Sequence, residues 1–354
     1  MIGIRADGNK QIGIGHVMRC LTIADALREQ GEQVVFFLAD EACRELVTSR
    51  GFDCYVTDTA YNNMEAELPV LEEMLSDLRV DGLIIDSYFV TERYLTCLRD
   101  KIVTAYLDDM ESFAYPVDVL INYNVFAKTE AYPYGVAYSP ERENECGKNR
   151  ETLVLAGPEY APVRREFLEH RRPAENEVKN IMITLGGSDA YNLSSKIAEK
   201  LLEHAGVNIH VVCGPFNLHK KQLYRLAEQN SDLNVHENVK EMWKLMAECD
   251  LAVSAAGSTM CELATMGVPA VTFSFVDNQK RIAEAFGERG AAVTVGHYEP
   301  ERETAFLADI FSAVTDLYND ADKRKKLALK ARETVDGRGA VRIAEVIVGC
   351  VSAK

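Results

Sequence analysis

Residues 2–31 read IGIRADGNKQIGIGHVMRCLTIADALREQG and join a short apolar run, a glycine-rich turn and an amphipathic segment. The run Ile2 to Arg5 is typical of a buried strand. From His16 to Gln30 the apolar residues recur at helical spacing, and Gly31 is a common stop signal. This stretch therefore predicts a strand, a turn and a helix in succession.

The same alternation of strand-like and helix-like segments continues along the chain. Further strands are predicted at residues 34–38, 82–86, 102–107, 178–185, 208–213, 233–236, 251–254, 270–273 and 292–295. Alternating strands and helices build parallel sheets with right-handed crossovers. The predicted fold class is therefore α/β, with two Rossmann-like doubly wound domains facing a cleft. In such sheets, ligands bind outside the carboxyl ends of the strands.

The pattern also suggests where the first domain ends and the second begins. Between residues 115 and 159 the alternation weakens and Tyr, Pro and Asn accumulate, which favours long functional loops. Residues 164–177 are strongly charged and favour a linker helix closed by Pro173. We therefore expect an N-terminal domain over residues 1–163, a second domain over 175–335 and an amphipathic C-terminal helix within 336–354.

Composition excludes several classes of partner. The chain has 354 residues, of which 47% are hydrophobic, so it can bury a substantial core. It holds no run of roughly 18 uncharged apolar residues and begins with no leader-like segment, so we expect a cytoplasmic protein without a membrane partner. The formal charge is −16, and residues 1–160 carry 14 Lys and Arg against 28 Asp and Glu. This acidic surface disfavours nucleic acid as a partner.

Nine cysteines without a Cys-x-x-Cys pair favour reduced thiols and no structural metal.

The first glycine-rich motif lies between the first predicted strand and helix. It contains Gly13 and Gly15 but has Met18 where a dinucleotide fingerprint needs Gly or Ala, and the chain has no Gly-Lys-Ser/Thr phosphate loop. His16 follows at the helix start, where the neutral ring can accept a proton from water. Asp7 could orient this ring, position water or simply stabilise the loop, just as His16 could be no more than a loop cap.

The second motif begins at Ser254 and offers free backbone N–H groups at a strand-to-helix turn through Gly257 and Ser258. Glu262 lies one turn into the predicted helix, where its carboxylate could accept two ribose hydroxyls. A glutamate in the first turn also favours the helix dipole, so a purely structural role stays open.

The combination of Gly-Ser-x-x-x-Glu, Gly-Val-Pro and Asn-Gln resembles the UDP-sugar signature of GT-B nucleotide-sugar enzymes, which include the peptidoglycan N-acetylglucosaminyltransferase. Together with the first motif, the chain resembles the UDP-sugar hydrolases of pseudaminic acid biosynthesis. Further matching segments lie at residues 86–88, 107–109, 186–189 and 336–343. The resemblance implies a C-terminal helix that packs back toward the N-terminal domain.

The resemblance implies an enzyme that uses water as the acceptor. It would convert UDP-2,4-diacetamido-2,4,6-trideoxy-β-L-altropyranose into UDP and the free sugar with inversion, without a metal ion or another cofactor, in a pathway linked to flagellin glycosylation. The implied catalytic residues are His16, Asp7 and Tyr88. The implied substrate-binding residues are Gly13, Gly15, Arg19, Gly186, Gly187, Ser188, Gly257, Ser258, Thr259, Glu262, Asn278 and Gln279.

Three alternatives stay open on the sequence. A GT-B glycosyltransferase would pass the sugar to a lipid or sugar acceptor, although the acidic N-terminal half disfavours a lipid surface. A hydrolase of a related nucleotide-activated diacetamido sugar would carry the same motifs. A binding module would keep the nucleotide contacts and show no turnover. The expected partner is a small-molecule UDP-sugar; the oligomeric state is open, with a monomer expected.

Overall fold

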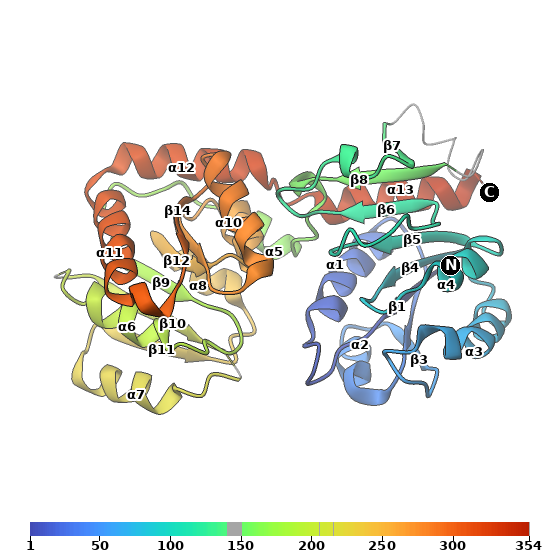
Figure 1. The fold of residues 1–354 in the computed structure, drawn as a ribbon, viewed down its shortest axis with the longest axis horizontal. Helices are drawn as coiled ribbons and strands as arrows, with labels where there is room; N and C mark the ends of the chain where they lie inside the picture. The colour runs from blue at the N-terminus through green and yellow to red at the C-terminus, as the bar shows by residue number, and fades with distance from the viewer. Residues whose placement is uncertain (140–150, 205, 215, 354) are drawn as a thin grey trace. The chain divides into compact units, whose positions relative to one another are not determined.

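The computed structural model describes residues 1–139, 151–204, 206–214 and 216–353 (Figure 1). The chain divides into two compact units. The first unit comprises Met1–Val163 and Arg338–Lys354, and the second comprises Arg164–Gly337. Each unit is an α/β layered structure built on a parallel sheet, which confirms the predicted fold class.

The described residues of the first unit form an eight-stranded sheet in the order β3-β2-β1-β4-β5-β6-β8-β7, with every neighbouring pair parallel. Its strands are β1 (Ile2–Ala6), β2 (Val34–Leu38), β3 (Asp53–Val56), β4 (Gly82–Asp86), β5 (Val103–Leu107), β6 (Val119–Asn122), β7 (Gly135–Ala137) and β8 (Thr152–Ala156).

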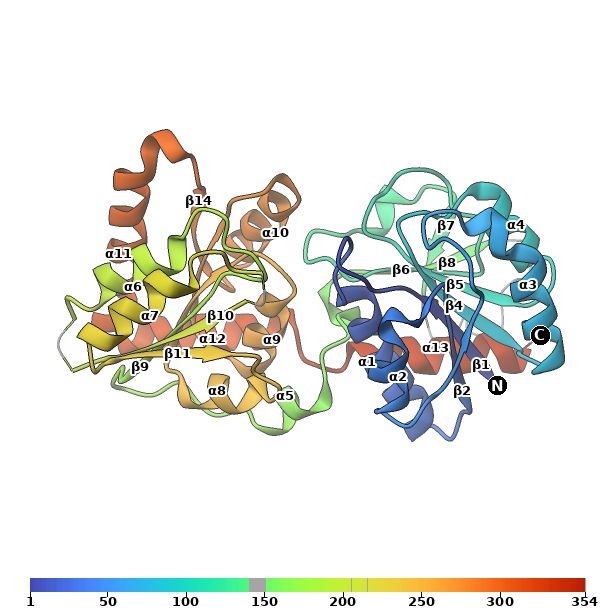
Figure 2. The ribbon, with the colours of Figure 1, turned by 90° about the horizontal axis from the view of Figure 1, so that it is seen from below.

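Helices cover both faces of this sheet. On one face, α1 and α13 pack together and cover Ile4 and Ile84 (Figure 2). On the other face, α3 and α4 cover Leu83 and Ile85. Strands buried on both faces are mostly apolar, which is why they stood out in the sequence. The helices of this unit are α1 (Gly15–Glu29), α2 (Arg44–Thr48), α3 (Met64–Asp77), α4 (Glu92–Arg99) and α13 (Gly339–Ala353).

Residues 115–159 contain three strands that the sequence did not predict. Within the described residues 115–139 and 151–159, β6, β7 and β8 extend the sheet, and the other residues lie in loops, turns and two short 3-10 helices. These strands have only four, three and five residues, so their alternation is too short to stand out among the Tyr and Pro residues. The linker helix α5 (Arg165–Glu169) ends before Pro173, and the Arg171 side chain binds the main-chain oxygens of Thr265 and Asp336.

The second unit has a six-stranded parallel sheet in the order β11-β10-β9-β12-β13-β14. Figure 2 shows α6 and α7 on one side of this sheet and α8 on the other. The strands are β9 (Asn180–Thr184), β10 (Asn208–Cys213), β11 (Leu233–Glu237), β12 (Leu251–Ala255), β13 (Ala270–Ser274) and β14 (Val293–His297). The helices after α5 are α6 (Leu193–Leu201), α7 (Lys220–Gln229), α8 (Met242–Glu248), α9 (Thr259–Met266), α10 (Asp277–Glu288), α11 (Glu303–Asn319) and α12 (Ala321–Thr334).

The strand orders place one ligand-binding position in each unit. In the first sheet, the chain moves outward in opposite directions from β1 and β4, and in the second from β9 and β12. A crevice opens outside the carboxyl ends of two such strands, because the helices that follow them lie on opposite faces. The residues that follow β1, β4, β9 and β12 are therefore the candidates for function.

Among the residues that the structure describes, seven cysteines are free thiols. Cys350 is disulfide-bonded, so the prediction of reduced thiols is wrong at that position. No helix in the described ranges is both long and apolar enough to cross a membrane.

Candidate active site

His16 and Asp86 meet at the carboxyl ends of β1 and β4. His16 lies in the first turn of α1, and Asp86 is the last residue of β4. His16 Nδ1 lies 2.6 Å from Asp86 Oδ1. Because an ionised carboxylate can only accept, Nδ1 carries the proton and donates it to Asp86. The lone pair of His16 then lies on Nε2, which has no hydrogen-bond partner among the residues that the structure describes.

Asp86 is also bound by Arg19 on the next turn of α1. Arg19 Nε donates to Asp86 Oδ2 at 2.6 Å, and Arg19 Nη2 donates to Oδ1 at 2.6 Å. Burial raises the pKa of Asp86, but the charge of Arg19 and hydrogen bonds from Arg19 and His16 bring that pKa well below its usual range. Asp86 is therefore an ionised carboxylate although it is almost completely buried.

The remaining nitrogen of Arg19 binds two residues that follow later strands. Nη1 donates to Tyr123 Oη at 2.7 Å and forms an ion pair with Asp109 Oδ2 at 2.7 Å. The Arg19 side chain is 13% exposed. Sequence reasoning expected this residue to bind substrate, but the structure places its guanidinium among carboxylates and a phenol of the same unit.

Tyr88 covers the His16 ring. The two rings pack edge to face, with centroids 4.4 Å apart and an interplanar angle of 79°. Burial, followed by the charge of Asp109, raises the pKa of the Tyr88 phenol, so this group stays protonated near neutral pH. Tyr88 is nevertheless 47% exposed, which leaves it able to contact a ligand beside His16.

The structure does not bring Asp7 to His16. Asp7 instead accepts hydrogen bonds from Arg5 Nη1 at 2.6 Å and from the backbone N–H of Ala39 at 2.8 Å. Side chains alternate along a strand, so Arg5 and Asp7 point to the α3 side of the sheet, whereas α1 covers the other side. Asp86, and not Asp7, is the carboxylate that orients the His16 ring. Asp86 lies in the matching segment 86–88, but no role was predicted for it from the sequence.

Cys20 does not form a dyad with His16. It packs in the core beneath α1, and its Sγ donates to Asp86 Oδ2 at 3.5 Å. Burial, followed by the charge of Asp86, raises the pKa of this thiol. Cys20 is therefore a protonated core residue.

In the second unit, a loop of small residues follows β9 and another follows β12. Gly186, Gly187 and Ser188 form an exposed turn directly after β9. Gly257 and Ser258 lie between β12 and α9. A Cβ atom on Gly257 would meet no described atom within 4 Å, and its φ lies outside the left-handed region. Neither packing nor backbone conformation requires glycine at position 257, so the space beside it is available to a ligand. The same holds for Gly15 in the first unit.

Glu262 points from the first turn of α9, one turn after Thr259. Its side chain is 26% exposed, and its Oε1 lies 3.9 Å from Arg164 Nη2. Burial raises the pKa of Glu262 to about 7, although the charge of Arg164 acts in the opposite direction. The carboxyl therefore changes protonation state near neutral pH.

Asn278 and Gln279 lie in the first turn of α10, after β13, rather than in a loop. Asn278 is exposed, whereas Gln279 Oε1 accepts a hydrogen bond from the backbone N–H of Phe275 at 3.1 Å. Gly13 lies in the turn before α1, where its φ of 74° favours glycine and its backbone N–H donates to the Asn9 carbonyl.

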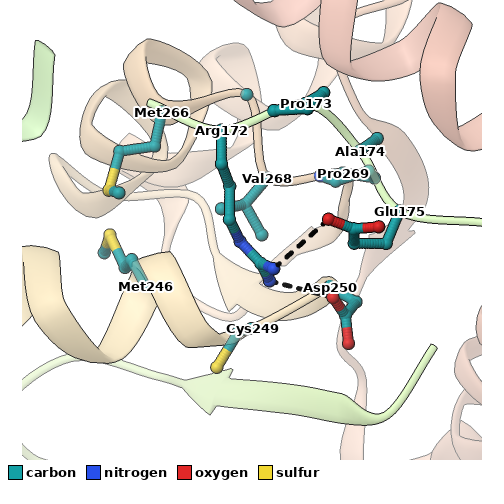
Figure 3. Close-up of a pocket in the computed structure, with 11 residues that line it drawn as sticks. Arg172, Pro173, Ala174, Glu175, Met246, Cys249, Asp250, Met266, Val268 and Pro269 are labelled. Atoms are coloured by element: carbon teal, nitrogen blue, oxygen red, sulfur yellow. Dashed lines mark hydrogen bonds and ion pairs between the residues drawn. The ribbon is translucent and has the colours of Figure 1, made fainter. Parts of the chain in front are cut away.

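A separate small pocket lies at the opposite edge of the second sheet (Figure 3). Arg172 lies across it, with Nη2 2.9 Å from Asp250 Oδ1 and Nη1 4.0 Å from Glu175 Oε1. Asp250 and Pro269 immediately precede β12 and β13, so this pocket is at the amino ends of the strands. None of the predicted site residues lines it.

A family model and several relatives match this chain. Residues 180–338 match the glycosyltransferase family 28 C-terminal domain. An uncharacterized protein, MJ1062 of Methanocaldococcus jannaschii, is 28% identical over 345 residues, which cover 90% of this chain and 66% of that protein. The UDP-2,4-diacetamido-2,4,6-trideoxy-beta-L-altropyranose hydrolase of Campylobacter jejuni is 27% identical over 292 residues, which cover 82% of this chain and 97% of the relative.

Among solved structures, MurG of Acinetobacter baumannii superimposes with a TM-score of 0.66 at 20% identity, covering 98% of each chain. The chain has a GT-B fold. The GT-B likeness explains why each unit carries a parallel sheet in which the first six strands follow the same order. Together with the family match and the relatives, it supports a GT-B enzyme related to those that act on nucleotide sugars.

Proposed function

We propose that this protein hydrolyses UDP-2,4-diacetamido-2,4,6-trideoxy-β-L-altropyranose to UDP and the free sugar, with inversion at the anomeric carbon. The observation that carries the proposal is the pair of His16 and Asp86 at the carboxyl ends of β1 and β4, with Nε2 of His16 free to accept a proton. The similarity to the Campylobacter jejuni hydrolase supports this choice of substrate.

In the proposed reaction, His16 acts as the general base. Nε2 takes a proton from water while the water oxygen forms a bond to the anomeric carbon. The bond from that carbon to the diphosphate oxygen breaks, and UDP leaves with the electron pair. Asp86 stabilises the imidazolium that forms, through the hydrogen bond at Nδ1. Attack opposite to the departing UDP inverts the configuration, so a single water-activating group suffices.

The second unit is proposed to hold the UDP group. The backbone N–H groups of Ser258 and Thr259 at the start of α9 and the turn at Gly186–Ser188 can bind the diphosphate, since helix N-termini favour anions. We assign this role to them rather than to a metal ion. Glu262 accepts the ribose hydroxyls with its carboxylate, and Asn278 and Gln279 lie at the same edge of the sheet.

The surroundings of His16 suit a sugar with apolar substituents. Ile14 is 54% exposed, Tyr88 47% and Met110 57%. They follow β1, β4 and β5, which are adjacent strands of the first sheet. Exposed apolar side chains gathered at one edge of a sheet favour contact with methyl groups. The proposed sugar offers these in its two acetamido groups and in its 6-deoxy position.

Replacing His16 by alanine tests the proposal. We expect turnover to fall by about 10²-fold to 10⁴-fold, the usual contribution of a general base. UDP affinity measured by calorimetry should stay within about twofold, a range of less than 0.5 kcal/mol. His204→Ala is a matched control, because His204 stacks on Phe311 away from both motifs. Full turnover by the His16→Ala variant would overturn the assignment. Assays are run with and without EDTA, and loss of turnover with EDTA would contradict the metal-free mechanism.

A further inference from the structure

We propose that His297 is a substrate-binding residue that donates its Nε2–H to an acetamido carbonyl oxygen of the sugar, with Ser274 holding the ring in the required tautomer. His297 is the last residue of β14, and Ser274 is the last residue of β13. The sugar contact rests on the proposed function, whereas the tautomer of His297 can be measured in the free protein without any substrate.

Strand β14 contains one extra residue that changes the direction of His297. Thr272 pairs with Thr294 before this irregularity. Ser274 pairs with His297 after it, so two steps along β13 correspond to three along β14. Gly296 lies within the irregularity and has a φ of 88°, which favours glycine. One extra residue in a strand moves the side chains that follow it to the other face of the sheet.

The extra residue brings His297 to the face of the sheet that α10 covers. Val293 and Val295 pack into the core on the opposite face, together with α11. In an uninterrupted strand His297 would join them, because side chains alternate. Instead, His297 Nδ1 lies 2.9 Å from Ser274 Oγ. Ser274 alternates with Phe273 of the same core, so it faces α10, which packs against both β13 and β14 (Figure 1).

Ser274 determines which hydrogen the His297 ring presents outward. Ser274 is 1% exposed, and its hydroxyl has His297 Nδ1 as its one hydrogen-bond partner among the described residues. A buried hydroxyl whose hydrogen has no acceptor costs free energy, so this hydroxyl donates to Nδ1 when the ring is neutral. The neutral ring then carries its hydrogen on Nε2, and a doubly protonated ring carries one there as well. Nε2 is therefore a donor in both forms.

This donor is available to a ligand. His297 is partly exposed, and its Nε2 has no hydrogen-bond partner in the ranges that the structure describes. Asp277 interacts electrostatically with His297, but its carboxylate pairs with Lys280 at 2.7 Å. The neighbouring Asn278 is exposed in the first turn of α10. His297 thus presents an N–H group at the carboxyl edge of the sheet, where this fold binds ligands.

The position of His297 favours the sugar over the nucleotide. An N–H group needs an acceptor oxygen, and the strongest acceptors of the proposed substrate are the oxygens of UDP and the two acetamido carbonyls. The proposed UDP contacts follow β9 and β12, whereas β14 is two strands beyond β12 in the sheet. Neighbouring strands lie about 4.8 Å apart, so about 10 Å separate His297 from the diphosphate position after β12. An acetamido carbonyl is therefore the assigned partner.

The first test determines the tautomer of His297 by NMR of the histidine ring nitrogens, in the free protein at alkaline pH. We expect the hydrogen on Nε2 in the wild type, and a detectable Nδ1–H form in Ser274→Ala, because the hydroxyl that donates to Nδ1 is then absent. Ser195→Ala is the control, since the Ser195 hydroxyl binds Asn192. An Nδ1–H ring in the wild type, or an unchanged tautomer in Ser274→Ala, would overturn the proposal.

The second test measures the affinities for UDP and for the proposed substrate by calorimetry, in the His16→Ala background so that the substrate is not consumed. His297→Asn keeps an acceptor for Ser274 at the position of Nδ1 and loses the outer donor. His297→Gln instead places an amide N–H at the position of Nε2. His297→Asn should lower the ratio of substrate affinity to UDP affinity by about 3-fold to 12-fold, the contribution of one net hydrogen bond. His297→Gln should lower it less.

The two variants separate a ligand contact from a structural role. An unchanged affinity ratio in His297→Asn would overturn the proposal, whether both affinities fall or neither does. A larger loss in His297→Gln than in His297→Asn would show that only the bond to Ser274 matters. His204→Asn is the matched control, because His204 stacks on Phe311.

Turnover, measured with His16 intact, distinguishes this inference from the proposed function. Hydrolysis together with an affinity ratio that does not depend on His297 would support the proposed function and reject the inference. Substrate binding that depends on His297 without hydrolysis would support the inference and reject the proposed function. Absence of substrate binding would reject both.

Discussion

Replacing Asp86 by asparagine is the sharpest perturbation of the proposed dyad. The amide keeps the size of the carboxylate and one acceptor oxygen, but it replaces the other oxygen by a donor. Asp86 accepts from His16 Nδ1 and from two nitrogens of Arg19. The new NH₂ group must therefore face at least one donor, so at least one of these bonds is lost.

The structure sets the size of both expected effects. A hydrogen bond to a charged group contributes about 1.5 to 3 kcal/mol, and breaking a buried ion pair costs about 3 to 5 kcal/mol. Asp109 still pairs with Arg19 in the variant, which favours the lower value, so we expect the free energy of unfolding to fall by about 3 kcal/mol. Loss of the oriented base should lower kcat/KM by about 10²-fold to 10⁴-fold. This corresponds to about 3 to 5 kcal/mol of transition-state stabilisation.

The assay measures UDP release with a coupled enzyme, and urea unfolding measures stability in parallel. UDP affinity serves as the internal check, because the proposed UDP contacts lie in the second unit. Asp77→Asn is the matched control, since Asp77 is exposed at the end of α3. If folded Asp86→Asn keeps kcat/KM within about threefold of the wild type, a difference of less than 1 kcal/mol, the dyad is not the proton acceptor.

Three further predictions follow from the structure. Because the pKa of Glu262 is raised to about 7 and ribose hydroxyls need an ionised acceptor, UDP affinity should rise as pH increases through 7. Calorimetry should show that this pH dependence disappears in Glu262→Gln, and its persistence would reject the ribose assignment. Gly257→Ala should leave thermal stability unchanged or slightly higher, since its Cβ meets no described atom within 4 Å, but UDP binding should weaken by at least tenfold, about 1.4 kcal/mol; unweakened binding would mean that no ligand approaches Gly257. Glu67→Gln should lower the free energy of unfolding by about 3 kcal/mol, because Glu67 and its partner Arg5 are fully buried; urea unfolding that shows a loss below about 1 kcal/mol would contradict a structural role for this pair.

The fold class and the two glycine-rich motifs could be predicted from the sequence because both leave a local pattern in the chain. Strands buried on both faces are mostly apolar, so β1, β2 and β4 were visible as short runs between helical segments. The small residues after β1, β9 and β12 then fell at the carboxyl ends, where the fold places ligands.

Other features depend on contacts that one sequence does not show. The chain does not reveal which face of β1 is covered by α1, so Asp7 could be assigned to His16 although it lies on the opposite face. The partners of Arg19 lie about 70 to 100 residues further along the chain, and only the fold brings Asp86 and Tyr123 to it. The residues of a motif do not reveal by themselves whether its arginine is already paired.

The central claim is that water, and not a second substrate, accepts the sugar. The most direct measurement follows UDP-2,4-diacetamido-2,4,6-trideoxy-β-L-altropyranose by NMR in the absence of any added acceptor, recording both UDP and the anomeric configuration of the sugar as it is first released. We predict one free sugar for each UDP, released with inverted configuration. UDP release only after a lipid or sugar acceptor is added, or release with retained configuration, would contradict the proposed hydrolysis.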